Sequence, residues 1–170
     1  LNKISAERVL SELCGLLTSR NSHRNIFRVL TEFRDIAAVI IPEFRECTGF
    51  VQHSRFHCFD VYEHCVMSAQ KAAEISAGSE CRLPLTLAML LHDIGKPQRF
   101  TLGEDGEGHF YGHAAVSADI AKDILRRLKC SNALRERVCT IVRYHDVPLS
   151  DTDKSVRRLL RKYGLETVRD

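Results

Sequence analysis

The spacing of apolar residues constrains the fold of this chain more than any other feature of its sequence. Leucine, isoleucine, valine and phenylalanine recur three and four positions apart along most of the 170 residues, and the alternating apolar and polar runs of half-buried strands are absent. This spacing gathers apolar side chains on one face of a helix. The sequence therefore predicts an all-α fold, a bundle of several helices preceded by a short helical neck.

Capping residues and prolines set the limits of the helices expected in the first half of the chain. Ser5 can cap a helix, and Pro42 must end another, because proline disfavours helical backbone at the residue before it. Asp60 stands three residues before a glutamate, the pattern of a capping box. The expected helices cover residues 5–21, 24–41 and 60–75, with an irregular segment over 46–58. The second helix is expected to pack through Phe27, Leu30, Phe33 and Ile36.

Glycines and prolines punctuate the second half of the chain. Pro84 suits the first turn of a helix that Gly95 and Pro97 end, which places His92 and Asp93 in its last turn. Four glycines between residues 98 and 112 predict an irregular excursion of the kind that often shapes a site. Further helices are expected over residues 113–129, 131–146 and 151–163. A boundary near residue 50 would divide the chain into the neck, residues 1–50, and a second domain, residues 51–170.

Composition excludes several classes of protein. With 44% hydrophobic and 28% charged residues the chain is typical of a folded globular domain. No apolar run is long enough to span a bilayer and the first residues do not resemble a signal peptide, so we expect a cytoplasmic protein without a membrane partner. A net charge of +3 is compatible with a phosphate-bearing partner. The seven cysteines lack metal-binding or redox spacing, which favours reduced thiols in the core.

The adjacent residues His92 and Asp93 are the strongest chemical signal in the sequence. Other histidines stand at helix ends or beside loops, where side chains from separate helices can converge. These are His64, His113 and His145, the last followed by Asp146. Imidazole nitrogens with a carboxylate suit divalent transition ions, and such an ion lowers the pKa of water and makes it a nucleophile. The sequence therefore predicts a divalent-metal site, with Mn, Co, Ni, Fe and Mg all compatible.

Structural roles are the alternative for these residues. A histidine in an amphipathic helix is more often a partly buried, hydrogen-bonded residue than a ligand. Asp93 is harder to explain in this way, because the helix dipole opposes a carboxylate near a helix C-terminus and an apolar run precedes it. His57 is an alternative first ligand, whereas His23, His53 and His109 are expected at the surface.

Two further features favour other interpretations. The Gly106–Gly108 segment lacks the lysine and serine that follow in a phosphate loop, which favours a flexible excursion. A basic cluster near the end of the chain is able to contact an RNA backbone, but a solvated helix face is the more common role of so short a cluster, and no aromatic platform for base stacking accompanies it. Its members are Lys154, Arg157, Arg158, Arg161 and Lys162.

Several segments in order resemble a known family. A resemblance to the HD superfamily of metal-dependent phosphohydrolases is carried by LAMLLHDIGKP, with VYEH before it. A closer resemblance, to the HD-containing part of bacterial tRNA nucleotidyltransferases (the CCA-adding and poly(A) polymerase family), is carried by HCFDVYEHCV, LLHDIGKPQRF, GEGHFYGHAAVSA and IVRYHDVPL. The segments SAERVLSEL and IIPEF resemble the region after the polymerase head of that family. The resemblance covers nearly the whole chain and implies an HD-domain bundle.

The resemblance implies roles for individual residues. His92 and Asp93, with the histidine of VYEH, would be the central metal ligands, and Lys96 would face the substrate phosphate. Asp93 and Lys96 are therefore the expected catalytic residues. Two more histidines match positions that serve a second metal in binuclear members. The full set of expected metal ligands is His64, His92, Asp93, His113, His145 and Asp146.

The chain departs from the family pattern at two points. The later aspartate that usually completes the site has no clear counterpart, so Asp146 or Asp153 is expected to substitute, or the piece is truncated. The sequence also lacks the Gly-Ser motif and paired aspartates of a nucleotidyltransferase head, so this chain alone is not expected to add nucleotides. We expect either the C-terminal portion of a longer protein or a free-standing relative.

Two classes of function follow from the sequence. As an enzyme, the chain would be the metal-dependent phosphohydrolase domain of a tRNA nucleotidyltransferase-like protein, acting on a phosphoester or nucleotide such as a cyclic nucleotide or nucleoside phosphate. As a binding module, it would be the non-catalytic tRNA-holding body of a CCA-adding enzyme, with a structural or vestigial metal site. Salt-sensitive RNA affinity that survives His92→Ala and Asp93→Ala would favour the second class.

Overall fold

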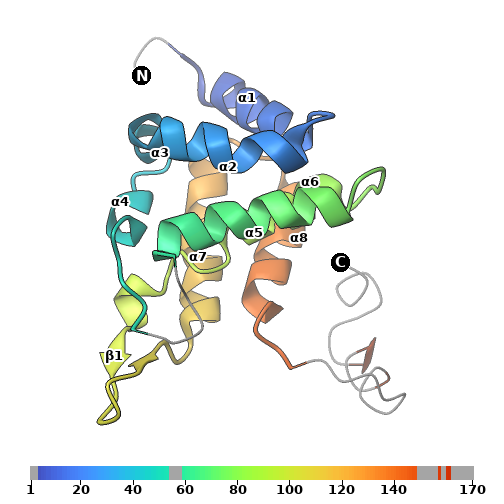
Figure 1. Cartoon of the computed structure of the whole chain (residues 1–170). Coiled ribbons are helices and arrows are strands. Elements are labelled where there is room, and N and C mark those ends of the chain that lie inside the picture. Colours follow the sequence, from blue (N-terminus) through green and yellow to red (C-terminus); the bar gives the residue numbers. More distant parts are fainter. Residues whose placement is uncertain (1–3, 54–58, 149–156, 158–159, 162–170) are drawn as a thin grey trace.

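The computed structural model describes residues 4–53, 59–148, 157 and 160–161. Helices make up most of this part of the chain (Figure 1) and follow in the order α1 (Ala6–Thr18), α2 (Ser22–Glu32), α3 (Arg34–Ile40), α4 (Phe44–Cys47), α5 (Val61–Ile75), α6 (Arg82–Leu91), α7 (His113–Arg127) and α8 (Asn132–Tyr144). A short 3-10 helix, Pro97–Arg99, and two strands, β1 (Thr101–Leu102) and β2 (Gly108–His109), lie between α6 and α7. The expected all-α bundle is confirmed.

The first expected helix begins as predicted, whereas the second is divided. The Ser5 side chain accepts a backbone hydrogen bond and caps α1. The expectation of one helix over residues 24–41 is wrong, because Phe33 leaves the helical conformation, with φ −109° and ψ 37°, between α2 and α3. The break turns the buried face, so Phe33 and Ile36 are 53% and 57% exposed while Leu30 and Ala37 are buried.

Helix α5 packs against α2 and carries His64 in its first turns. Asp60 caps α5 as predicted, by accepting a hydrogen bond from a first-turn amide at 2.7 Å. The buried Tyr62 hydroxyl donates to the carbonyl oxygen of Leu30 at 2.8 Å, and the side chain of Gln70 accepts from another α2 amide at 2.9 Å. These bonds fix the helix that bears His64 against the N-terminal helices.

Helix α6 ends beside α7, and α7 packs along α8 (Figure 1). It ends at Leu91, so His92 occupies the C-cap and Asp93 the turn beyond, slightly later than the expected last turn. Gly95 lets this turn approach α7: its amide donates to the Ser117 hydroxyl at 3.0 Å, and a Cβ at Gly95 would lie 2.7 Å from the backbone nitrogen of Ser117. The close approach brings the His-Asp pair to the start of α7.

The glycine-rich excursion contains a small hairpin that the sequence did not predict. Strands β1 and β2 are antiparallel, with Thr101 opposite His109. Strands of two residues are too short to show alternation, which is why the apolar pattern missed them. The Gly108 amide donates to the carbonyl oxygen of His53 at 2.8 Å and so anchors the hairpin to the segment before α5.

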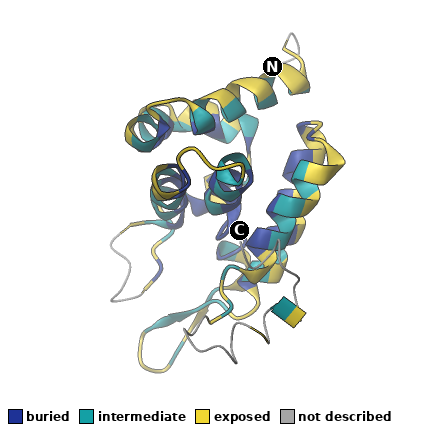
Figure 2. Ribbon diagram, turned by 90° about the vertical axis from the view of Figure 1, so that its right-hand side faces the viewer, coloured by how far each residue is buried: buried dark blue, intermediate teal, exposed yellow. Residues whose placement is uncertain are grey.

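Helices on both sides of residue 50 contribute to one hydrophobic core. Its buried residues run from Leu17 in α1 and Ile26 in α2, through α5, α6 and α7, to Val142 in α8. Figure 2 shows that the buried parts of the helices face the interior. The neck helices therefore pack on the helices that carry the histidines. The division at residue 50 into two domains stays a prediction.

Several other expectations can be compared with the described residues. Cysteines in this part of the chain are free, and Cys47, Cys65 and Cys130 are buried as expected of core thiols, whereas Cys58 lies outside the described residues. Most of the helix expected over 151–163 also lies outside them. Among the helices that the structure describes, none combines the length and apolarity needed to cross a membrane.

Candidate metal centre

One buried carboxylate, that of Asp93, lies where four helices meet. Its residue is 2% exposed. His64 comes from the first turns of α5, His92 from the C-cap of α6, His113 from the first residue of α7 and His145 from the C-cap of α8. The Nε2 atoms of all four rings lie within 3.5 Å of a carboxylate oxygen of Asp93. The structure thus brings together five of the six expected metal ligands.

The two oxygens of Asp93 face different pairs of histidines. Oδ2 lies 3.3 Å from His64 Nε2 and 3.2 Å from His92 Nε2, and these nitrogens are 3.2 Å apart. Oδ1 lies 3.1 Å from His113 Nε2 and 3.5 Å from His145 Nε2, which are also 3.2 Å apart. Each oxygen and its two nitrogens form a group of ligand atoms that could hold a metal ion, and the two groups share Asp93.

Backbone carbonyls fix the tautomer of three of these histidines. The Nδ1 atoms of His92, His113 and His145 lie 2.8, 2.9 and 2.7 Å from the carbonyl oxygens of Met89, Phe110 and Val142, respectively. A carbonyl oxygen only accepts, so Nδ1 carries the proton and Nε2 of the neutral ring keeps its lone pair. Lone pairs therefore converge around the carboxylate, an arrangement that a cation between them stabilises.

The Oδ1 atom of Asp93 is a second observation that fits a metal. It is buried and has no hydrogen-bond donor among the described residues. The ammonium of Lys96 compensates the carboxylate at Oδ2, 2.8 Å away, but a buried oxygen without a donor is itself unfavourable, and a cation beside Oδ1 would remove that cost. Nitrogen and carboxylate donors together suit borderline divalent transition ions. The residues present therefore fit the divalent metal that the sequence predicts.

The charges at the centre shift the pKa values of its members. Burial alone would raise the pKa of Asp93, but the four surrounding imidazoles outweigh burial and hold it well below its ordinary value. Burial lowers the pKa of His92 by more than Asp93 raises it. Burial also acts to lower the pKa of His145, but the neighbouring Asp93 carboxylate and the carbonyl oxygen of Val142 favour the protonated ring and raise the pKa overall. At neutral pH Asp93 is therefore ionised and His92 neutral, the forms that bind metals.

A lysine and a glutamine complete the buried polar cluster. Lys96 Nζ lies 2.8 Å from Asp93 Oδ2 and donates at 2.8 Å to Oε1 of Gln52. Both side chains are buried, and the ring centroid of Phe110 lies 5.2 Å from Nζ. Sequence reasoning missed Gln52, because it falls in the segment over 46–58, where no periodicity marks a buried position.

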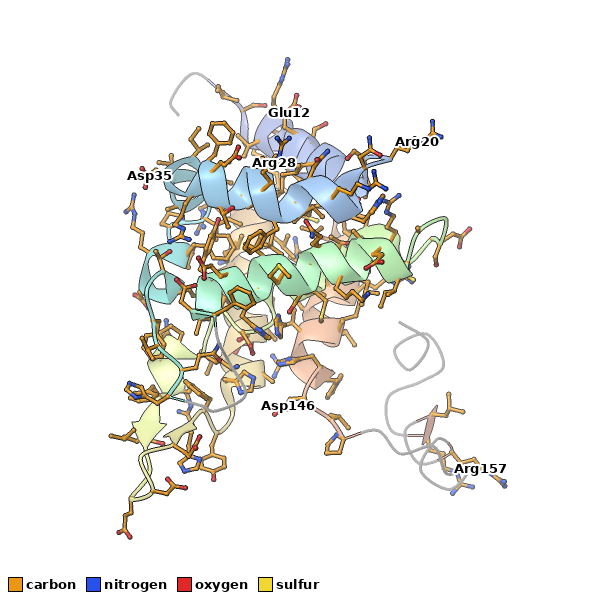
Figure 3. All side chains as sticks on the ribbon, in the orientation of Figure 1. Glu12, Arg20, Arg28, Asp35, Asp146 and Arg157 are labelled. Atoms are coloured by element: carbon orange, nitrogen blue, oxygen red, sulfur yellow. The ribbon has the colours of Figure 1, made fainter. Side chains whose placement is uncertain are left out.

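The other expected residues lie apart from the centre or outside the described residues. Asp146 follows α8 (Figure 3), is exposed, and belongs to neither ligand group. Of the pair His145 and Asp146, only His145 reaches the centre. His57 and Asp153 lie outside the described residues, as do Lys154, Arg158 and Lys162, whereas Arg157 and Arg161 are exposed.

Sequence comparisons agree with this geometry. The family model of the HD domain matches residues 61–166, a range that contains the carboxylate and all four histidines of the centre. The A-adding tRNA nucleotidyltransferase of Deinococcus radiodurans is 36% identical over 157 residues, which are 92% of this chain and 35% of that protein. The CC-adding tRNA nucleotidyltransferase of Thermus thermophilus is 34% identical over 94% of this chain and 36% of its own length.

A third relative, the multifunctional CCA protein of an Azoarcus species, is 32% identical over 86% of this chain and 34% of its own length. The chain thus spans about a third of the length of the curated relatives it matches. The HD model covers more than half of the chain, and the His-Asp pair lies within the matched region. The chain therefore belongs to the HD domain family.

Proposed function

We propose that this domain is a metal-dependent phosphohydrolase that cleaves phosphoesters of nucleotides or RNA ends. The observation that carries the proposal is the shared carboxylate of Asp93, whose two oxygens each face a separate pair of imidazole nitrogens. Asp93 with His64 and His92, and Asp93 with His113 and His145, would hold divalent cations at this centre. Divalent cations held there would polarise a phosphoryl oxygen and lower the pKa of a water nucleophile.

The protein's own residues orient these ligands before any ion or substrate binds. Three of the imidazoles are tied through Nδ1 to carbonyl oxygens of their own chain segments, so their Nε2 atoms are already directed at Asp93. Fixed ligands lose little conformational freedom when they bind, and hydrogen bonds of this kind also raise the basicity of the imidazole. Asp93 in turn supplies the negative charge that holds both groups together.

Lys96 is the residue that we assign to the substrate phosphate. Its ammonium carries three N–H groups, and the contacts with Asp93 and Gln52 account for two of them. We assign the third to a phosphoryl oxygen, where a buried positive charge stabilises the negative charge that develops during hydrolysis. In this role Gln52 holds the ammonium in position and does not touch the substrate.

The relatives suggest the class of phosphoester. Two of them are named as an A-adding and a CC-adding tRNA nucleotidyltransferase and the third as a multifunctional CCA protein, and the region that matches this chain is about a third of their length. From the relatives we take only the class of substrate, and we propose that a nucleotide or an RNA end binds at the centre. The cytoplasmic location expected from the sequence stays a prediction.

Elemental analysis and a hydrolysis screen test the proposal together. Purified chain is stripped of metal and assayed on a panel of phosphoesters with Mn, Co, Ni, Fe or Mg added singly. Metal-dependent turnover is expected, with loss in Asp93→Asn and His92→Ala. The matched control is His23→Ala, which changes a histidine on α2 outside both ligand groups and should retain turnover.

Two results would contradict the phosphohydrolase. Full metal-dependent turnover in both Asp93→Asn and His92→Ala would show that the chemistry occurs elsewhere. Absence of turnover with every metal, together with salt-sensitive tRNA binding that Asp93→Asn leaves unchanged, would instead support the non-catalytic tRNA-holding body.

A further inference from the structure

An exposed tyrosine, Tyr111, stands two residues before one of the histidines of the candidate metal centre. Tyr111 is the last residue but one of the glycine-rich excursion, and the residue is 74% exposed. It stands two residues before His113, whose Nε2 lies 3.1 Å from Asp93. Two peptide units separate the Cα atoms of Tyr111 and His113, so the ring is attached close to the ligand.

The surrounding residues hold Tyr111 in place. The ring of His109 stacks on it, with centroids 5.4 Å apart and planes 12° from parallel. Arg99 Nε donates to the carbonyl oxygen of Tyr111 at 2.9 Å. Gly112 follows in the left-handed conformation, with φ +76°, and turns the chain directly into α7. The His109 ring therefore supports one side of the Tyr111 ring, and the hydrogen bond from Arg99 fixes the Tyr111 backbone. Because the residue is exposed, the ring is available to stack on another planar group.

We propose that Tyr111 is the stacking platform for the base of a nucleotide whose phosphate lies at the Asp93 centre. The inference rests on the proposed function and adds a preference for nucleosidic over simple phosphoesters. A base has an aromatic face of the kind that stacks on tyrosine, and one sugar separates it from the phosphate. A ring anchored two residues from a metal ligand suits that separation.

Stacking gives the platform a measurable effect. Removing an aromatic ring that stacks on a base weakens binding by about 5- to 150-fold, because alanine substitution at such contacts costs roughly 1–3 kcal/mol per base. Every base has an aromatic face, so the platform selects for a base without specifying which one. Tyr111→Ala should therefore weaken nucleotide binding and leave a phosphoester without a base unaffected.

Fluorescence of a 2-aminopurine ribonucleotide tests the stack directly, because stacking quenches it and the chain contains no tryptophan to interfere. Tyr111→Ala is compared with Tyr111→Phe, which keeps the aromatic face. Phe33→Ala is the matched control, since it removes another exposed ring between α2 and α3. Melting temperatures of all variants check that they fold.

The inference predicts quenching by the wild type, by Tyr111→Phe and by Phe33→Ala, and binding at least 5-fold weaker in Tyr111→Ala. In parallel, kcat/KM should fall in Tyr111→Ala for a nucleoside phosphate but stay constant for glycerol phosphate. Equal quenching by Tyr111→Ala and the wild type would overturn the inference, and so would an equal fall in kcat/KM for both substrates. If no metal supports hydrolysis of either substrate, the proposed function fails, while quenching still decides whether Tyr111 stacks on a base.

Discussion

Adding a divalent metal to the metal-free protein is expected to raise its melting temperature in two separable increments. A ligand at 100 times its Kd stabilises the folded state by about 2.7 kcal/mol per site. For a chain of this length, that free energy corresponds to about 5–11 °C per site. The structure contains two ligand groups that share Asp93, so the wild type should show about twice that shift.

Single substitutions should remove one or both increments of the metal-induced rise in melting temperature. Asp93→Asn changes a member of both groups and is expected to lose both increments. His64→Ala removes a ligand from the first group only, and His145→Ala from the second only, so each should retain one increment. Scanning calorimetry of stripped protein titrated with Mn²⁺ or Co²⁺ measures the shifts, with His23→Ala as the control that keeps both.

Two outcomes would refute this reasoning. If His64→Ala and His145→Ala each abolish the whole shift, the histidines hold one ion or act as an inseparable unit. If Asp93→Asn keeps the whole shift, the metal binds elsewhere and the shared carboxylate has no role in holding it.

Three further predictions concern the residues around the centre and in the core. Gly95→Ala is expected to lower the free energy of unfolding, measured in urea, by about 1–3 kcal/mol, because the new Cβ would lie 2.7 Å from the backbone nitrogen of Ser117. An unchanged midpoint of the urea transition would show instead that the turn shifts freely. Gln52→Leu removes one of the two acceptors that Lys96 contacts, and it is expected to lower the free energy of unfolding by about 1–3 kcal/mol in the same assay. Undiminished stability would contradict the role of that bond. Burial raises the pKa of Tyr62 from 10.0 to about 12, so its folded state favours the neutral phenol. The stabilisation that comes from keeping the Tyr62 phenol neutral is complete below pH 10. It is lost as the pH rises towards 12, which lowers the free energy of unfolding by about 3 kcal/mol. A difference in the free energy of unfolding between wild type and Tyr62→Phe that stays constant over this range would refute the prediction.

Local sequence signals predicted where several helices begin, but they did not predict the break between α2 and α3, which depends on packing with distant residues. Ser5, Asp60 and Ser131 all cap helices, because capping depends on a side chain and the amides a few residues away. The break at Phe33 carries no proline, glycine or cap, so nothing local marks it. Leu30 before the break and Ala37 after it are both buried, whereas Phe33 and Ile36 are exposed, so the tertiary structure overrides the apolar spacing.

In the candidate site, too, the sequence indicated some residues and missed others. The sequence indicated the histidines and Asp93, because ligand residues at helix ends are visible as residue types, and the structure brings them together while the metal itself stays a prediction. It did not indicate Gln52, whose burial depends on the hairpin and on Lys96. The sequence also did not indicate Tyr111 as a platform, since the exposure of its ring and its stacking on His109 depend on the folded backbone.

The bonds from Nδ1 of His92, His113 and His145 to carbonyl oxygens three positions earlier have an evolutionary consequence. Each imidazole is aimed by a stretch of only four residues of its own chain. Mutations elsewhere on the surface around the centre can accordingly admit a new substrate without changing the orientation of these three imidazoles. A centre built this way can be inherited unchanged while specificity diverges around it.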